Sequence, residues 1–90
     1  MTPDKVREVM AIYRKRFEEA GIEKKKLLDA SHNSYSLNSL QHCYAMLDEI
    51  DVFIQEARMD KVFRWLGFIQ GCLWSHGVYT LDDLKNHNRP

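Results

Sequence analysis

The sequence predicts an all-α fold, in which an N-terminal helix packs on a helical hairpin and a short C-terminal helix completes a small bundle. Apolar residues recur at spacings of three and four along most of the chain, which is the period of a helix with one buried face. Residues that cap or stop helices stand at the ends of these segments. With 90 residues, 44% of them apolar, the chain is expected to form one helical domain over 1–90.

The first helix is predicted over residues 3–20. Thr2 is a hydroxyl N-cap, Pro3 suits the first helical position, and Gly21 is a natural stop. The apolar stripe of this helix contains Val6, Val9, Met10, Tyr13, Phe17 and Ala20.

The middle of the chain predicts a loop followed by a second helix. Residues 22–37 have no clear period and are rich in turn-forming residues, which is typical of a mobile connection. The pair Leu27-Leu28 is expected to attach this loop to the core, and Ser36 or Asn38 to cap the next helix. The stripe of that helix contains Leu40, Cys43, Tyr44, Leu47, Ile50, Ile54 and Ala57.

A third helix is predicted from an N-cap at Asp60 to Ser75, before Gly77. A turn near 57–60 would fold the second and third helices into a hairpin, which lets them bury their stripes against each other. One long bent helix is the alternative, because only Asp60 interrupts the pattern. The capping sequence at Thr80 predicts a fourth helix through Asn86, with a polar tail over 87–90.

The third helix carries more apolar bulk than one helix partner can cover, and it also carries two glycines one turn apart. Gly67 and Gly71 remove side chains along a strip, so another backbone can approach closely. Each costs a soluble helix about 1 kcal/mol relative to alanine, so a compensating contact is expected. Phe63, Gln70 and Trp74 flank the strip. Close packing inside the monomer and a subunit interface are both consistent with this pattern.

Charge and composition argue against several classes of partner. Lys plus Arg equals Asp plus Glu at 13 each, so there is no global attraction to nucleic acid or to an anionic membrane, and self-association is mildly favoured. The longest apolar stretch, about 13 residues, is too short to span a bilayer and contains Arg64 and Gln70. The charged N-terminus lacks a secretion signal, so we expect a soluble cytoplasmic protein with reduced cysteines.

No residue pattern predicts catalysis, a bound metal or a cofactor. The histidines lack the spacing of metal ligands, and the densest acidic group lies on a helix face expected to be solvated. Cys43 and Cys72 stand about equally far from the hairpin turn, so they could face each other as a disulfide switch or a metal pair. Two small buried thiols are the favoured interpretation. The histidines are His32, His42, His76 and His87, and the acidic group is Asp48, Glu49, Asp51 and Glu56.

Basic residues with aromatic residues nearby suggest an alternative, a small-ligand site. The basic side chains would hold the phosphates of a nucleotide or nucleotide signal, and a tyrosine would stack on the base. The competing and favoured interpretation is a solvated face neutralised by nearby glutamates. The residues of this alternative site are Arg7, Tyr13, Arg14, Lys25, Lys26 and Tyr35.

Several stretches of the chain resemble a known group of proteins. They are Phe63-Arg64-Trp65-Leu66-Gly67-Phe68-Ile69-Gln70-Gly71, Tyr79-Thr80-Leu81-Asp82-Asp83-Leu84, His87-Asn88-Arg89-Pro90, Thr2-Pro3-Asp4-Lys5-Val6-Arg7 and Tyr13-Arg14. Together they are similar to small proteins encoded by tailed bacteriophages and by bacteria that carry prophages. The likeness covers about two thirds of the chain and departs over 23–38. No activity is assigned to that group, so the resemblance implies no functional residues, only a small accessory protein of the bacterial cytoplasm.

The leading functional hypothesis is a non-enzymatic interaction protein. It would form a homo-oligomer through Phe63, Gly67, Gln70, Gly71 and Trp74, and in a phage setting it would bind or block a host or defence component. The alternative is a protein that sequesters a nucleotide. Nucleic acid is not an expected partner, because the net charge is zero.

Overall fold

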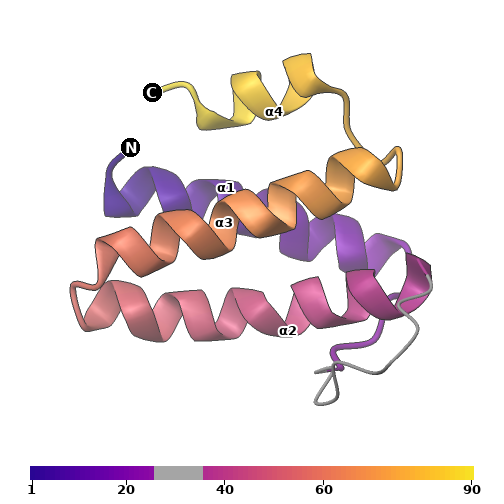
Figure 1. Cartoon of the computed structure of the whole chain (residues 1–90), viewed down its shortest axis with the longest axis horizontal. Helices are drawn as coiled ribbons and strands as arrows, with labels where there is room; N and C mark the ends of the chain where they lie inside the picture. Colours follow the sequence, from indigo (N-terminus) through magenta and orange to yellow (C-terminus); the bar gives the residue numbers. More distant parts are fainter. Residues whose placement is uncertain (26–35) are drawn as a thin grey trace.

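A computed structural model gives the architecture of the chain (Figure 1). The structure describes residues 1–25 and 36–90, and the side chains of residues 36–38 lie outside that description. Within these ranges the chain forms the helices α1 (Pro3–Glu19), α2 (Ser36–Gln55), α3 (Met59–Ser75) and α4 (Leu81–Asn88), with no strand. The predicted all-α fold is confirmed.

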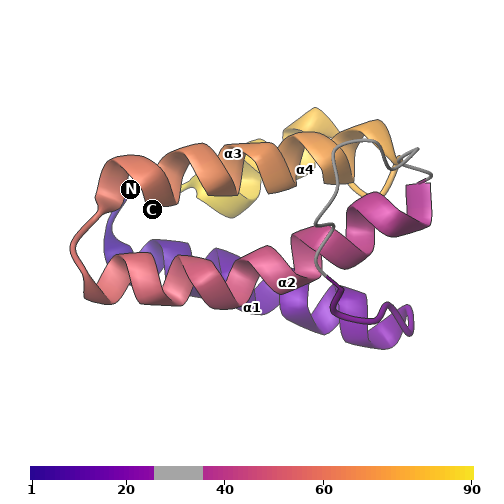
Figure 2. The ribbon, with the colours of Figure 1, turned by 60° about the horizontal axis from the view of Figure 1, so that its bottom comes forward.

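Helices α2 and α3 pack against each other as an antiparallel hairpin, and this excludes one long bent helix. Helix α1 packs against α2, and the short α4 returns along α1. Figure 2 shows the resulting pairs, with α3 above α2 and with α4 and α1 lying behind them. The side of α3 that is covered by neither α2 nor α1 therefore lies next to α4.

The core lies between α1 and the hairpin, where the apolar stripes of the helices meet. Burial of each large apolar side chain there contributes about 1.5–3 kcal/mol. The predicted stripes are largely confirmed, but Met46 is also buried, whereas Ala20 and Ala57 are exposed. The buried residues are Val6, Val9, Met10, Tyr13, Phe17, Cys43, Tyr44, Met46, Leu47, Ile50, Ile54, Val62, Leu66, Ile69, Leu73 and Leu84.

Helices α1, α2 and α3 end in the same way, on a residue with positive φ. That residue is Gly21 after α1 (φ 68°) and Gly77 after α3 (φ 71°), as the sequence predicts, but it is Ala57 after α2 (φ 58°). Beyond Ala57 the N–H of Arg58 donates to the carbonyl of Phe53 at 2.9 Å, which completes a Schellman turn. This turn reverses the chain between α2 and α3.

Two predicted boundaries need correction, and a third lies mostly outside the described residues. Asp60 is not the N-cap of α3, because Arg58 takes that position and Asp60 lies in the first turn. Helix α4 continues to Asn88, so His87 and Asn88 are part of a helix and not of a polar tail. The loop predicted over 22–37 lies mostly outside the described residues, and so do the side chains proposed to anchor it or to cap α2.

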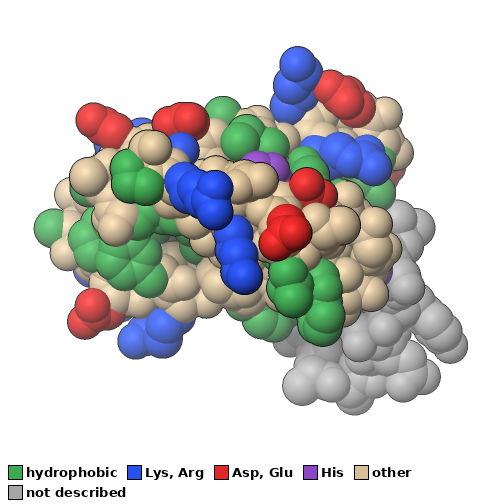
Figure 3. Space-filling model, turned by 90° about the horizontal axis from the view of Figure 1, so that it is seen from above, with side chains coloured by type: hydrophobic (Ala, Val, Ile, Leu, Met, Phe, Trp, Pro, Cys, Tyr) green, Lys and Arg blue, Asp and Glu red, His purple; other side chains and the backbone are tan. Residues whose placement is uncertain are grey.

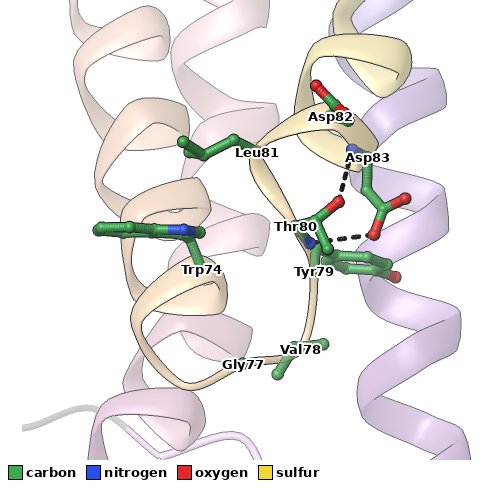
Figure 4. Close-up of a pocket in the computed structure, with 8 residues that line it drawn as sticks. All are labelled: Trp74, Gly77, Val78, Tyr79, Thr80, Leu81, Asp82 and Asp83. Atoms are coloured by element: carbon green, nitrogen blue, oxygen red, sulfur yellow. Dashed lines mark hydrogen bonds between the residues drawn. The ribbon is translucent and has the colours of Figure 1, made fainter.

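Both capping signatures that the sequence predicts are present. The Thr2 side chain accepts a hydrogen bond from the Lys5 N–H at 3.1 Å. Thr80 and Asp83 form a capping box, in which each side chain accepts from the backbone N–H of the other. Because this box fixes the first turn of α4, it also fixes where the chain turns back from α3 (Figure 4).

Candidate functional site

One side of α3 is exposed although it is rich in apolar and small residues. Phe63, Gly67, Gly71 and Trp74 lie at steps of four, four and three, so they share one face of the helix, which we call the glycine face. Phe63 is 41% exposed and Trp74 is 52% exposed. The predicted strip is therefore a real surface feature, about a third of a turn from the buried stripe of the same helix.

The two glycines of this face have no neighbour across it. A Cβ atom built on Gly67 or Gly71 meets no other atom within 4 Å, outside the helix's own backbone. Among the residues that the structure describes, close packing inside the monomer therefore does not account for them. A subunit interface at this strip stays a prediction.

Helix α4 and the start of the chain form a second wall beside the glycine face, and we call the space between them, which contains two pockets, the groove. Leu81 on α4 is 55% exposed and Met1 is 47% exposed. Met1, Phe63 and Gly67 line a pocket of about 270 Å³. Trp74 and Leu81 line another of about 480 Å³ near the turn into α4. Figure 4 shows the Trp74 and Leu81 side chains projecting to the same side of this turn.

Gln70, one of the predicted interface residues, lines the same pocket as Phe63 and Gly67 and uses its amide for hydrogen bonds within the monomer. The amide is half-buried, and its Nε2 atom donates to the Tyr13 hydroxyl at 3.0 Å and to Oδ1 of Asn88 at 2.7 Å. Asn88 donates in return to Oε1 of Gln70 at 3.3 Å. Gln70 therefore joins α3 to α1 and α4 and supports the wall of the groove from below.

The Tyr13 hydroxyl completes this polar network. It accepts from Gln70 and lies 3.1 Å from Nδ1 of His87, so its own O–H is free to donate to that nitrogen. Burial raises the pKa of Tyr13 to about 12, although the hydrogen bond from Gln70 opposes the change. The rings of Tyr79 and His87 meet edge to face at 4.7 Å. The network holds α4 at a fixed position beside α3.

Charged residues differ between the two ends of the groove. Asp82 and Asp83 line the pocket at the Trp74 end. Arg64 flanks Phe63, and Arg89 follows Asn88 at the other end, and within the described residues neither guanidinium forms a salt bridge. Figure 3 looks onto this side of the molecule and shows hydrophobic side chains in separate patches with charged groups between them. Of these four charged residues, the two aspartates line a pocket of the groove and the two arginines do not.

The structure separates the residues of the alternative ligand site. Tyr13 is fully buried, so its ring cannot stack on a base. Arg7 lies on an exposed side of α1, where it pairs with Asp4 at 3.5 Å. Lys25 is exposed near the end of the first described segment, and Lys26 and Tyr35 lie outside the described residues.

Arg14, the remaining residue of that set, serves a structural purpose. Its Nη2 atom contacts Asp51 at 2.6 Å, Asp48 at 3.3 Å and the Leu47 carbonyl at 3.2 Å, so it ties α1 to α2. Burial lowers the pKa of Arg14, but the two carboxylates raise it overall above its ordinary value. Because Arg14 is paired in this way, its guanidinium is not free to hold a phosphate as the alternative site requires.

Cys43 and Cys72 do face each other across the hairpin. The neighbouring Cys43 is the main cause that lowers the pKa of Cys72 to about 7, and both cysteines are free. Cys43 is fully buried and Cys72 is partly exposed. In the described part of the chain no three side chains of His, Cys, Asp or Glu gather into a metal site, so the metal-pair interpretation has no further ligands there.

Sequence reasoning missed some residues of this surface. Leu81 and Met1 belong to the apolar groove, and Asn88 and His87 fix its α4 wall. Their positions follow from how α4 returns along α1, and no local pattern encodes that path.

None of the described helices combines the length and apolar character needed to cross a membrane. Comparison with protein-family models, with curated proteins and with solved structures found no match to this chain.

Proposed function

We propose that the protein is a non-enzymatic interaction protein that self-associates by pairing the glycine face of one copy with that of a second copy. The observation that carries this proposal is the exposure of both glycines between two half-exposed aromatic side chains. Two helical glycines cost the monomer about 2 kcal/mol relative to alanine, and exposed aromatic surface favours association. A second copy packed on this face would offset both costs.

The order of residues along the face suits a two-fold pair. An aromatic residue, a glycine, a glycine and an aromatic residue follow one another, so the face has the same pattern in either direction. When two copies run antiparallel, Gly67 of one lies opposite Gly71 of the other, and Phe63 lies toward Trp74. This is an isologous contact, in which both subunits use the same patch. Without side chains at the crossing, the helix axes can approach closer than the usual 8–10 Å or so.

The charges of the groove fit the same arrangement. Reversing one copy brings Asp82 and Asp83, which line the pocket near Trp74, toward the Phe63 end of the other copy, where Arg64 and Arg89 are the sequence neighbours of Phe63 and Asn88. Pairs at such a rim contribute little to affinity, about 0–1 kcal/mol each. They do select the antiparallel orientation over the parallel one, in which like charges would meet. The zero net charge of the chain adds no long-range repulsion between copies.

A role as a small accessory protein that binds or blocks a host or defence component is the wider part of this proposal. It is supported by the resemblance to phage-encoded proteins described above. Its test is plating efficiency: a phage that lacks this gene should plate less well on strains that carry the relevant defence, and the gene supplied from a plasmid should restore plating. Equal plating with and without the gene on every such strain would refute it.

Paired phenylalanine substitutions test the assembly surface. Phe63 lies on the glycine face, whereas Phe68 is 53% exposed about 140° around the same helix. Phe63→Ser should lower the molar mass of the assembly toward 10.7 kDa in light scattering, while Phe68→Ser should leave the mass unchanged. Both positions are exposed, so both variants should keep the helical circular dichroism of the wild type. Dissociation by Phe68→Ser but not by Phe63→Ser would move the interface to the other side of α3.

A further inference from the structure

Helix α3 has a second exposed face, on which the proposed self-association does not rest. Four of its residues recur at helical spacing and share one side of the helix, which we call the Phe68 face. These residues are Lys61, Arg64, Trp65 and Phe68. Phe68 is 53% exposed and lies about 140° around α3 from Phe63 of the glycine face. A second copy seated on the glycine face would therefore leave Phe68 uncovered.

An apolar pocket lies on this face, between α3 and α2. Its volume is about 300 Å³, and its lining consists of His42, Met46, Arg64, Trp65 and Phe68. Met46 is buried, Trp65 is half-buried and Phe68 is exposed, so apolar atoms line the pocket from its base to its rim. A methionine beside aromatic rings suits contact with an apolar side chain of a partner, because the thioether adapts its shape and the rings supply contact area.

A second pocket, of about 390 Å³, shares Arg64 with the first. Arg58, Lys61 and Arg64 contribute cations to its lining, and Asp60 contributes a carboxylate. Within the described residues neither Lys61 nor Arg64 forms a salt bridge, whereas the Arg58 guanidinium contacts Glu56 at 3.4 Å. The end of the Phe68 face near the α2–α3 turn therefore carries an excess of positive charge.

Aromatic rings hold two of these cations in place. The Lys61 ammonium lies 4.4 Å from the centre of the Phe53 ring and 5.5 Å from that of Trp65. The Arg58 guanidinium lies 5.3 Å from the Phe53 ring centre. The two rings meet edge to face at 4.8 Å. Because these contacts already restrict the cationic side chains, an anion that binds there orders them at a smaller cost in entropy.

We propose that the Phe68 face binds an acidic segment of a partner protein, in which a large apolar side chain is flanked by carboxylates. The apolar side chain would enter the pocket between Trp65 and Phe68, and the carboxylates would contact Lys61 and Arg64. Charge complementarity selects this occupant, because the apolar pocket and the cationic pocket meet at Arg64. The inference deepens the partner-binding part of the proposed function, on which it rests, and is independent of self-association.

The length of the face suits a short segment. Phe68 lies two turns beyond Lys61, about 10 Å along the helix, and about three extended residues span that distance. Nucleic acid fits less well, because the zero net charge of the chain gives no global attraction to it. The expected contact is therefore one apolar anchor with acidic neighbours on the side of the α2–α3 turn.

Fluorescence anisotropy with labelled synthetic peptides tests this proposal. The first probe is a phenylalanine flanked by glutamates, the second has lysines in place of the glutamates, and the third has serine in place of the phenylalanine. The wild type should bind the first probe and neither of the others, and the binding should weaken as the concentration of NaCl rises. No binding of the first probe, or equal binding of the second or third, would overturn the proposal. So would tighter binding of a single-stranded oligonucleotide or of phosphatidylserine vesicles.

Matched variants test whether the first probe binds at the Phe68 face. Phe68→Ser should weaken its binding about tenfold, because the aromatic rim of the apolar pocket is lost. Val52→Ser, at a site on α2 that is 48% exposed and outside both pockets, should bind as the wild type does. Arg64→Glu should also weaken binding about tenfold, since an attraction becomes a repulsion. Lys15→Glu makes the same charge change at an exposed site on α1 and should have no effect. Equal losses in the control variants would contradict the assignment.

Light scattering and plating separate this inference from the proposed function. If the wild type assembles but does not bind the first probe, this inference fails and the self-association stands. If the first probe binds as expected but the protein stays at 10.7 kDa, the acidic-segment site is supported and the self-association fails. If the probe binds but the gene has no effect on plating, the site is supported and the host-blocking role fails.

Discussion

At the residue scale, Tyr13 shows what the sequence can and cannot predict. Its place on the apolar stripe of α1 predicts burial, and the residue is fully buried. Its hydroxyl partners, Gln70 and His87, stand 57 and 74 positions away, so no local pattern could identify them. The prediction that Tyr13 stacks on a ligand rests only on the basic residues near it in sequence. Because the ring is fully buried, it has no room for that contact.

The first prediction concerns the Tyr13 hydroxyl. Tyr13→Phe should lower the free energy of unfolding by about 1–2 kcal/mol at pH 7, because His87 and Gln70 lose a buried hydrogen-bond partner. Urea denaturation followed by circular dichroism measures this change. Phe53→Leu, at a partly buried ring far from the network, is the control for a general loss of aromatic packing. An unchanged stability in Tyr13→Phe would mean that the network contributes nothing.

The same residue predicts a loss of stability at alkaline pH. The folded-state pKa of Tyr13, about 12, lies above its ordinary value of 10.0. Its contribution is therefore fully present below pH 10 and is lost as the pH rises through 12, since the unfolded chain releases the proton first. The wild type should lose about 2–3 kcal/mol relative to Tyr13→Phe over this range. Parallel curves for the two proteins would contradict the raised pKa.

A second titration belongs to Cys72. Its rate of alkylation by iodoacetamide should rise with a midpoint near pH 7, below the value of about 8.5 for a free cysteine. Cys43→Ala should move the midpoint upward, because the neighbouring Cys43 is the largest cause of the shift. His76→Gln should move it upward by less. A midpoint that is the same in all three proteins would show that neither neighbour acts on the sulfur.

At the element scale, helices α1, α2 and α3 each end on a residue with positive φ, and only the end of α2 lacks a glycine there. Gly21 and Gly77 predict their helix ends because glycine adopts positive φ without a steric penalty. The end of α2 at Ala57 has no glycine, so the sequence alone is consistent with either a hairpin or one long bent helix. Tertiary packing of α2 against α3 decides the matter, and it holds an alanine in the left-handed region at a cost of about 1–2 kcal/mol.

The turn at Ala57 gives the third prediction. Ala57→Gly should raise the free energy of unfolding by up to about 1 kcal/mol, because relief of the left-handed strain outweighs the greater flexibility of the unfolded chain. Thermal and urea unfolding both measure this gain. Ala11→Gly, at an exposed site within α1, is the matched control and should destabilise by a similar amount. If both variants are destabilised alike, the α2–α3 turn stores no strain.

At the scale of the whole molecule, the periodic stripes predicted the bundle but not the surface it leaves uncovered. The strip on α3 could be found from Gly67, Gly71 and their aromatic neighbours, because the spacing places them on one face. Whether that face was inside or outside depended on α4, which packs on α1 and leaves the glycines open. Gln70 was assigned to the interface because of its position near the strip. Its hydrogen bonds depend on the same path of α4, so sequence could not place it.

The open glycines predict opposite effects on the monomer and on the assembly. Gly67→Ala with Gly71→Ala should stabilise the monomer by about 2 kcal/mol, because a Cβ atom fits at both sites and alanine favours the helix. The same methyl groups should weaken self-association, since they hold two α3 helices apart at the crossing. Urea unfolding in dilute solution measures the first effect, and a concentration series by sedimentation measures the second. Stronger association in the double variant would argue against close approach of two backbones.

The most direct test of the proposed interface is the molar mass in solution, by light scattering over a range of concentrations. The wild type and Gly67→Leu/Gly71→Leu would be compared, with helical circular dichroism as a control for folding. Pairing through the glycine face predicts a wild-type mass that approaches twice 10.7 kDa as concentration rises, and a variant mass that stays at 10.7 kDa. A wild type that remains at 10.7 kDa throughout, or a variant that assembles equally well, would contradict it.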